Sequence, residues 1–140
     1  MKLTVVAIAL TSLGFLTFSS LESLEQKKIN NTQTIVENSK LLKKWELSHY
    51  ELFGSDYAPE TKEKNDYIHF HKDNTYSSIS EGVFEKGNYK LDKQTIVMTN
   101  NKEKGELKLI IKTLTENKLS VVIDDPNDTD AKYLTIHFKN

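Results

Sequence analysis

The chain has 140 residues, with 20 acidic and 19 basic side chains and a formal net charge of −1. This length suits a single domain. Every basic residue is a lysine. Without arginine the chain lacks the planar guanidinium group that binds phosphate with two hydrogen bonds, so a nucleotide or nucleic-acid site is disfavoured. Because there is no cysteine, disulfides, thiolate nucleophiles, zinc-thiolate sites and lipidation of an N-terminal cysteine are excluded. Core packing must therefore stabilise the fold.

The N-terminal segment has the layout of a secretory signal. Lys2 is followed by an uncharged stretch over residues 3–21, and Thr17 and Ser19 are small residues at the two positions that a signal peptidase reads. We expect a signal peptide over residues 1–19, cleaved after Ser19. An uncleaved anchor is the alternative, because the stretch approaches the roughly 20 apolar residues that cross a bilayer. Both interpretations predict a periplasmic or secreted protein.

Residues 20–40 are polar and carry no aromatic side chain. Thr34 and Glu37 have the spacing of a helix capping box, and the apolar residues around them favour a short helix. A disordered linker is the alternative that this composition leaves open.

From residue 41 onward, apolar residues alternate with polar ones in short segments separated by polar turns. This pattern predicts eight strands, at residues 45–53, 67–71, 75–80, 83–91, 95–100, 106–114, 119–124 and 133–138. The short connections favour consecutive antiparallel pairing, and eight strands close into a barrel whose interior is filled by side chains or holds one small ligand. Gly87 stands in mid-strand, where we expect a barrel corner or a bulge.

Several short motifs in this region carry a family resemblance. They are Leu-x-x-x-Trp-x-Leu at 41–47, Phe-x-x-Asp-Asn-Thr-Tyr at 70–76, Gly-Asn-Tyr-Lys-Leu at 87–91, Ile-Val-Met-Thr at 96–99, Lys-Thr-Leu-Thr at 112–115 and Ile-His-Phe-Lys at 136–139. In order and spacing the chain resembles the bacterial lipocalin-like domains of exported Bacteroidetes proteins.

The resemblance implies an all-β, up-and-down barrel over residues 41–140, with an internal cavity and Trp45 packed at its closed end. Lipocalins place a glycine two positions before this tryptophan, where Lys43 stands here, and they cover it with an arginine. We expect Lys139 to take the place of that arginine, because a lysine stem can cover an indole ring.

Strand alternation and the resemblance together predict a ligand site inside the barrel. His49 and Glu51 share a strand face with Trp45 and are expected at the mouth, although strand twist could leave them on the solvated rim. Tyr57, in the long connection over residues 54–66, is a candidate lid residue if that loop is not simply solvated. The predicted ligand-binding residues are Trp45, Leu47, His49, Glu51, Tyr57, Phe70, Tyr76, Tyr89, Met98, Leu109, Val121 and Ile136.

Two further segments could suggest metal binding, but we predict no metal and no cofactor. His69 and His71 share one strand face, but Ile68 and Phe70, on the other face, are expected to point into the interior. The two histidines would then be exposed, without a third ligand for a metal ion. The acidic segment 124–130 lacks the glycine and glutamate of a calcium-binding EF-hand loop. We interpret it as a polar turn.

The sequence marks no nucleophile beside a general base, so we do not expect an enzyme. It predicts an exported barrel that binds a small, largely apolar molecule, with membrane contact only if the N-terminal segment is uncleaved. The alternative is a barrel with a solid core that acts as a protein-interaction module. Its contact patch would be formed by the outward residues Tyr50, Tyr67, Ile110 and Val122.

Overall fold

A computed structural model describes residues 38–102 and 105–140, which belong to the compact unit Thr34–Asn140. The predicted signal peptide and nearly all of the predicted linker lie outside the described residues. Residues 38–41 are helical, at the end of the segment where a short helix was one expectation. Within the described ranges, no helix has the length and apolar character needed to span a bilayer.

Nine strands and two short 3-10 helices follow this helical turn. They are β1 (Lys44–Leu52), β2 (Ser55–Tyr57), η1 (Thr61–Glu63), β3 (Tyr67–Phe70), β4 (Thr75–Ser80), β5 (Val83–Asp92), β6 (Thr95–Asn100), β7 (Glu106–Leu114), β8 (Lys118–Ile123), η2 (Ala131–Tyr133) and β9 (Leu134–Lys139). The eight predicted strands are all present, with ends that differ by no more than one residue. The strand that the sequence did not reveal is β2.

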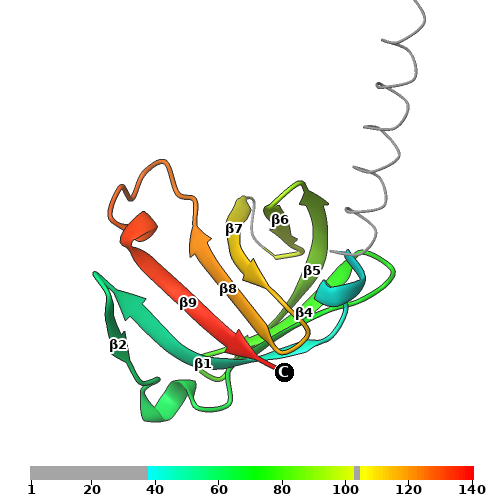
Figure 1. Ribbon diagram of the computed structural model, residues 1–140. Helices are drawn as coiled ribbons and strands as arrows, with labels where there is room; N and C mark the ends of the chain where they lie inside the picture. The colour runs from blue at the N-terminus through cyan, green and yellow to red at the C-terminus, as the bar shows by residue number, and fades with distance from the viewer. Residues whose placement is uncertain (1–37, 103–104) are drawn as a thin grey trace, which may run out of the picture. The chain divides into compact units, whose positions relative to one another are not determined.

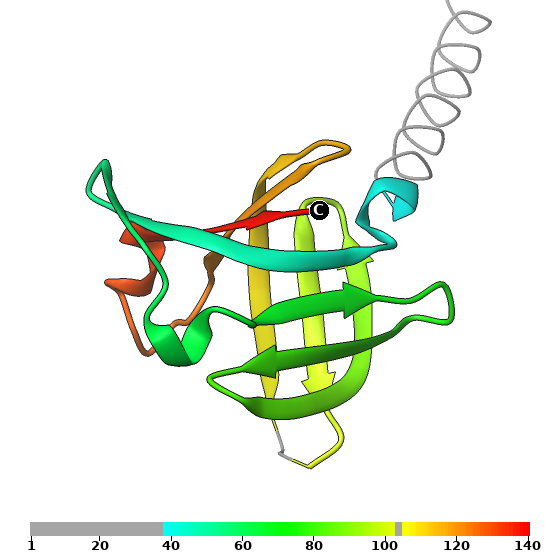
Figure 2. The ribbon, with the colours of Figure 1, turned by 90° about the horizontal axis from the view of Figure 1, so that it is seen from below.

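The strands form a closed antiparallel barrel, which confirms the predicted fold class. Neighbouring strands pair in the order β2-β1-β3-β4-β5-β6-β7-β8-β9, and an additional β1–β9 pairing closes the ring (Figures 1 and 2). One edge of β1 pairs with β3 at residues 44–46 and with β2 at residues 50–52. Because β2 folds back on β1 outside the ring, the barrel itself has eight strands.

Strand β5 turns a corner of the barrel at Gly87. Its first half pairs with β4 up to Asn88, and its second half pairs with β6 from Gly87 onward. A Cβ atom on Gly87 would collide with the Thr99 carbonyl oxygen and would lie 2.9 Å from Cε1 of Tyr76. Both registers run without a shift, so Gly87 is the predicted corner and not a bulge.

A β-bulge interrupts β1 at Ser48. Its pairing with β9 passes from Leu47 opposite Phe138 to His49 opposite His137, so one residue of β1 has no counterpart on β9. An extra residue reverses the alternation of faces along the strand beyond it. The second half of β1 therefore presents to the interior the residues that simple alternation would place outside.

The closed end of the barrel is built around Trp45, which is fully buried. Its indole Nε1 donates a hydrogen bond of 3.0 Å to the carbonyl oxygen of Leu41, so the helical turn at 38–41 is tied to this end. The cation over the indole is Lys43, with its Nζ 5.4 Å from the ring centroid. This corrects the expectation for Lys139, whose backbone pairs with Glu46 and Lys118 at the end of β9.

Candidate ligand-binding cavity

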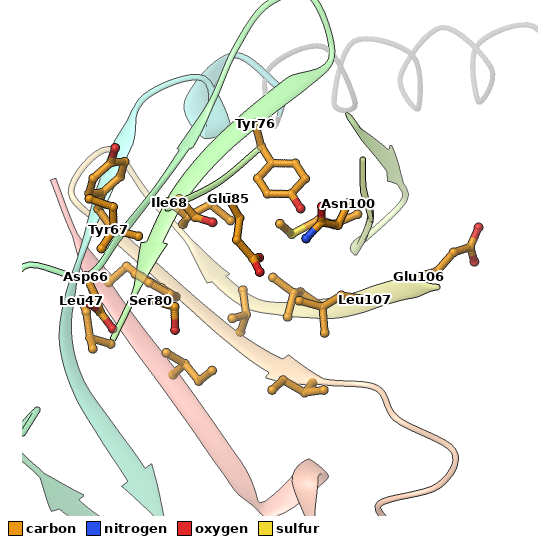
Figure 3. A pocket seen from close by; sticks show the side chains of 18 of the residues that line it. Leu47, Asp66, Tyr67, Ile68, Tyr76, Ser80, Glu85, Asn100, Glu106 and Leu107 are labelled. Atoms are coloured by element: carbon orange, nitrogen blue, oxygen red, sulfur yellow. The ribbon is translucent and has the colours of Figure 1, made fainter. Parts of the chain in front are cut away.

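The barrel encloses a cavity of about 480 Å³. Every barrel strand contributes to its lining, and most of the side chains are apolar (Figure 3). The lining residues are Leu47, Tyr50, Asp66, Tyr67, Ile68, Tyr76, Ser78, Ile79, Ser80, Glu85, Met98, Asn100, Gly105, Glu106, Leu107, Leu109, Val121, Ile123, Ile136 and Phe138.

The burial of these residues distinguishes a floor from a mouth. The floor consists of buried apolar side chains, among them Leu47, Met98 and Val121. The mouth is formed by exposed residues at the β4–β5 and β6–β7 hairpins, namely Ser80, Gly105, Glu106 and Leu107. The cavity is therefore apolar in its depth and meets solvent at one end of the barrel.

Tyr50 enters the cavity lining from the second half of β1. Its hydroxyl donates a hydrogen bond of 3.0 Å to Oε1 of Glu63, in the η1 turn. Burial raises the pKa of this phenol well above its ordinary value, and the hydrogen bond and negative charge of Glu63 raise it further. Tyr50 therefore stays protonated and holds η1 against the wall of the cavity.

Asp66 is a buried carboxylate that fixes the hairpin at the mouth. Its two oxygens lie 3.0 and 2.9 Å from the backbone nitrogen of Glu81, whose N–H donates to both. Glu81 and Gly82 form the two-residue turn between β4 and β5, with φ angles of 50° and 81°. Asp66 thereby ties β3 to a turn in the left-handed conformation.

A polar group of side chains lies on the β4–β6 side of the cavity. Tyr76 and Ser78 come from β4, Glu85 from β5 opposite Ser78, and Asn100 from β6. In Figure 3 the Tyr76 hydroxyl points toward Asn100, and the Glu85 carboxylate points into the cavity. Burial raises the pKa of Tyr76, and the charge of Glu85 adds to this rise. The cavity thus combines an apolar floor with one polar wall.

The sequence matches a model of the lipocalin-like domain over residues 41–121, which is more than half of the chain. The chain belongs to this lipocalin-like family. Two crystal structures of Bacteroides proteins show a similar fold at low sequence identity. A lipocalin-like protein from Bacteroides uniformis has a TM-score of 0.52 and 16% identity, over 72% of this chain and 98% of that one.

The second structure is a DUF4847 family protein from Bacteroides vulgatus. It has a TM-score of 0.50 and 11% identity, over 74% of this chain and 96% of that one. No curated protein matches the sequence. The comparisons therefore establish the family and the barrel, and they leave the ligand to be inferred from this lipocalin-like domain itself.

Six of the twelve predicted ligand-binding residues line the cavity of this lipocalin-like domain. They are Leu47, Tyr76, Met98, Leu109, Val121 and Ile136. Trp45, Phe70 and Tyr89 are buried at the closed end and do not line it. The Phe70 and Tyr89 rings make an edge contact at 4.9 Å, and the Tyr89 hydroxyl donates to the carbonyl of His71. Their role is to close the barrel.

His49 and Glu51 lie on the outer face, contrary to the expectation that they point into the mouth. The bulge at Ser48 turns both outward, where the His49 ring stacks on His137 and Glu51 Oε2 lies 3.3 Å from Nε2 of His137. Tyr50 takes the interior position. Alternation alone could not reveal this exchange, because a bulge is set by pairing with β9.

Tyr57 belongs to β2 and does not line the cavity. It pairs with Tyr50 across a two-residue turn at Phe53 and Gly54, and its side chain is 53% exposed. The connection that was expected to hang over the open end begins instead as a hairpin on β1. The signal that could have revealed it is Phe-Gly after an apolar strand, with glycine suited to the positive φ of a tight turn.

The predicted ligand-binding residues did not include the polar lining residues Asp66, Ser78, Ser80, Glu85, Asn100 and Glu106. Glu85 had a usable signal, because it alternates in phase with Gly87 and Tyr89 along β5. Asp66 had none, since its inward placement depends on how the connection from η1 returns to β3.

The His69 and His71 rings lie side by side, with centroids 4.1 Å apart. Burial lowers the pKa of His69, and the charges of His71 and Lys44 lower it further. Among the described residues, no group of three or more His, Asp or Glu side chains has a geometry that could hold a metal ion.

The outward patch expected for an interaction module does not form. Tyr50 lines the cavity, and Val122 is only 4% exposed. The Tyr67 ring is covered by Lys44, whose Nζ lies 4.5 Å from its centroid. Ile110 lies opposite Val122 in the β7–β8 pairing, but the four residues do not form one exposed surface.

Proposed function

We propose that this lipocalin-like domain binds a small, largely apolar molecule inside its barrel. The observation that carries the proposal is the cavity of about 480 Å³ with a buried apolar floor. Pockets that hold small molecules range from roughly 300 to 1,000 Å³ and are lined mainly by apolar side chains with a few polar groups. The volume and lining of this cavity fall within that description.

The cavity also argues against the solid-core alternative. Protein interiors are close-packed, with few voids larger than a water molecule. A barrel that served only as a scaffold for an outer binding surface would gain stability by filling its interior with larger side chains. Ser78 and Gly105 stand on the lining instead, where bulky residues would fill the space.

The site of action is proposed to lie outside the cytoplasm, as a periplasmic or secreted protein. This part rests on the uncharged stretch at residues 3–21 and the small residues at its end. The mass of the protein purified from its native host is expected to correspond to cleavage after Ser19. A mass that retains residues 1–19 would favour the anchored form.

Ligand binding is tested with a fluorescent apolar probe and a pair of matched variants. Ser78 and Ser77 are neighbours on β4, but Ser78 lines the cavity and Ser77 contacts His71 on the opposite face. S78F should fill the cavity and weaken probe binding by about ten-fold, which corresponds to ~1.4 kcal/mol. S77F should leave the affinity unchanged. Equal effects of the two variants, or no probe binding to the wild type, would reject the proposal.

A further inference from the structure

Glu85 is a charged side chain in a cavity whose lining is mostly apolar, and the binding of an apolar molecule does not require it. Period-two alternation along β5 places it inward, opposite Ser78 of β4. It stands two residues beyond Val83, which begins β5 beside the mouth. Figure 3 shows its carboxylate directed into the cavity. Glu85 is half-buried, so its carboxylate faces the cavity while keeping contact with solvent, and a ligand that covers it would have to offset the lost hydration with a hydrogen-bond donor.

The protein supplies no such partner from the part of the chain that the structure describes. No hydrogen bond or ion pair forms at the Glu85 side chain among residues 38–102 and 105–140. The cation on the nearby η1 turn, Lys62, is engaged by Glu81 at 3.0 Å and Glu60 at 3.7 Å. Asp66, the other carboxylate with its side chain in the lining, is already used by the backbone of Glu81. Among the described residues, Glu85 is therefore the carboxylate that points into the cavity without a partner on the protein.

The charge of the cavity lining also favours a positively charged ligand. The lining contains the carboxylates of Asp66 and Glu85, whereas the Glu106 side chain points away from the cavity (Figure 3), and none of the described residues that line it is lysine or histidine. Negative charge in a cleft with apolar walls raises the local concentration of cations and disfavours anions. A fatty acid would bring a second carboxylate toward Glu85, whereas a protonated amine would bring the missing donor.

We infer that the cavity selects an apolar molecule that carries a protonated amine, with Glu85 as the group that receives the ammonium. The inference rests on the proposed function, because it names the chemical class of the molecule in that same cavity. The hydrocarbon part would occupy the floor beside Met98 and Val121. The ammonium would meet Glu85 directly, with the hydroxyl of Ser78 and the ring of Tyr76 at its side.

The experiment compares three probes that share one ring system and differ in charge. Naphthylmethylamine is a cation at neutral pH, naphthylmethanol is neutral and naphthoate is an anion. Isothermal titration calorimetry on the wild-type protein should show the amine binding about ten-fold tighter than the alcohol, since a charge-assisted hydrogen bond exceeds a neutral one by about that factor. Naphthoate should bind more weakly than the alcohol.

Two variants identify Glu85 as the cause. E85Q preserves the shape and removes the charge, so it should abolish the preference for the amine and leave the affinity for the alcohol within about two-fold. The control is D92N, which removes one negative charge from the exposed end of the same strand. It should leave the affinities for all three probes unchanged.

The outcomes separate the two proposals. If the alcohol binds and the amine binds no tighter, the cavity holds a ligand but the inference about charge is wrong. If E85Q and D92N reduce amine binding equally, the general field of the protein attracts the amine and the role of Glu85 is rejected. If none of the three probes binds to the wild type, both the proposed function and the inference fail.

Discussion

The imidazole rings of His49 and His137 stack on the outer face of the barrel, with centroids 4.3 Å apart and planes inclined by 7°. The two residues face each other across β1 and β9 only because the bulge at Ser48 shifts the register by one residue. The same shift brings Tyr50 to the cavity. The bulge that brings the two histidines together on the outer face therefore also determines which residue of β1 lines the cavity.

Replacement of His137 should reduce stability without affecting the cavity. Its Nδ1 lies 2.8 Å from Oγ of Ser120, which is buried, and its Nε2 lies 3.3 Å from Glu51. H137F retains ring stacking but leaves the Ser120 hydroxyl without this partner, so we expect a loss of about 1–2 kcal/mol in the free energy of unfolding. Urea denaturation measures the loss. Weaker probe binding at unchanged stability would contradict the outward position of His137.

Gly87 should not tolerate alanine. The added methyl group would meet the backbone of Thr99 and the ring of Tyr76, so the corner of β5 would have to open. We expect G87A to lower the free energy of unfolding by more than about 2 kcal/mol, as overpacking does at rigid backbone positions. The matched control is G105A, because nothing lies within 4 Å of a Cβ built on Gly105. Thermal unfolding of the two variants should differ clearly, and similar melting temperatures would argue against the close approach at Gly87.

Lys43, and not Lys139, should support Trp45. Its Nζ lies over the indole and donates a hydrogen bond of 2.8 Å to the carbonyl oxygen of Glu116. K43A should lower the free energy of unfolding by about 1 kcal/mol and change the fluorescence emission of Trp45. K139A removes an exposed lysine and should leave both unchanged. A larger loss of stability in K139A than in K43A would instead support the expectation that Lys139 covers Trp45.

Tyr50 should make the protein lose stability at alkaline pH. Burial and Glu63 raise the pKa of its phenol above the ordinary value of 10.0, so the folded state retains the proton more strongly than the unfolded state does. The stability linked to this proton is intact below pH 10 and declines as the pH rises above that value. Y50F should therefore show a shallower decline in urea denaturation above pH 10.

The control for Tyr50 is Y133F, since Tyr133 is 47% exposed. It should retain the alkaline decline of the wild type. At neutral pH, Y50F should also lose about 1 kcal/mol of unfolding free energy, because the hydrogen bond to Glu63 is removed. Identical pH profiles for Y50F and the wild type would show that another group causes the decline.

The sequence by itself determined the eight strands of the barrel and their consecutive order in the sheet, but not β2. Alternation with a period of two fixes which side chains can be buried, and short polar turns force consecutive strands to pair. For this reason β4, β6 and β7 begin and end where predicted. The same alternation identified six cavity residues, such as Met98 and Val121, because they lie on strands without an interruption before them.

Only the tertiary structure decided the placement of Asp66 and which residues of β1 face the cavity. The bulge at Ser48 depends on pairing with β9, more than 80 residues away along the chain, and no local pattern encodes it. The same holds for Asp66, whose burial follows from its bond to a turn on another hairpin. The volume of the cavity is likewise a property of side chains meeting across the barrel. Alternation states which residues point inward, but the distance between opposite walls depends on the closed ring as a whole.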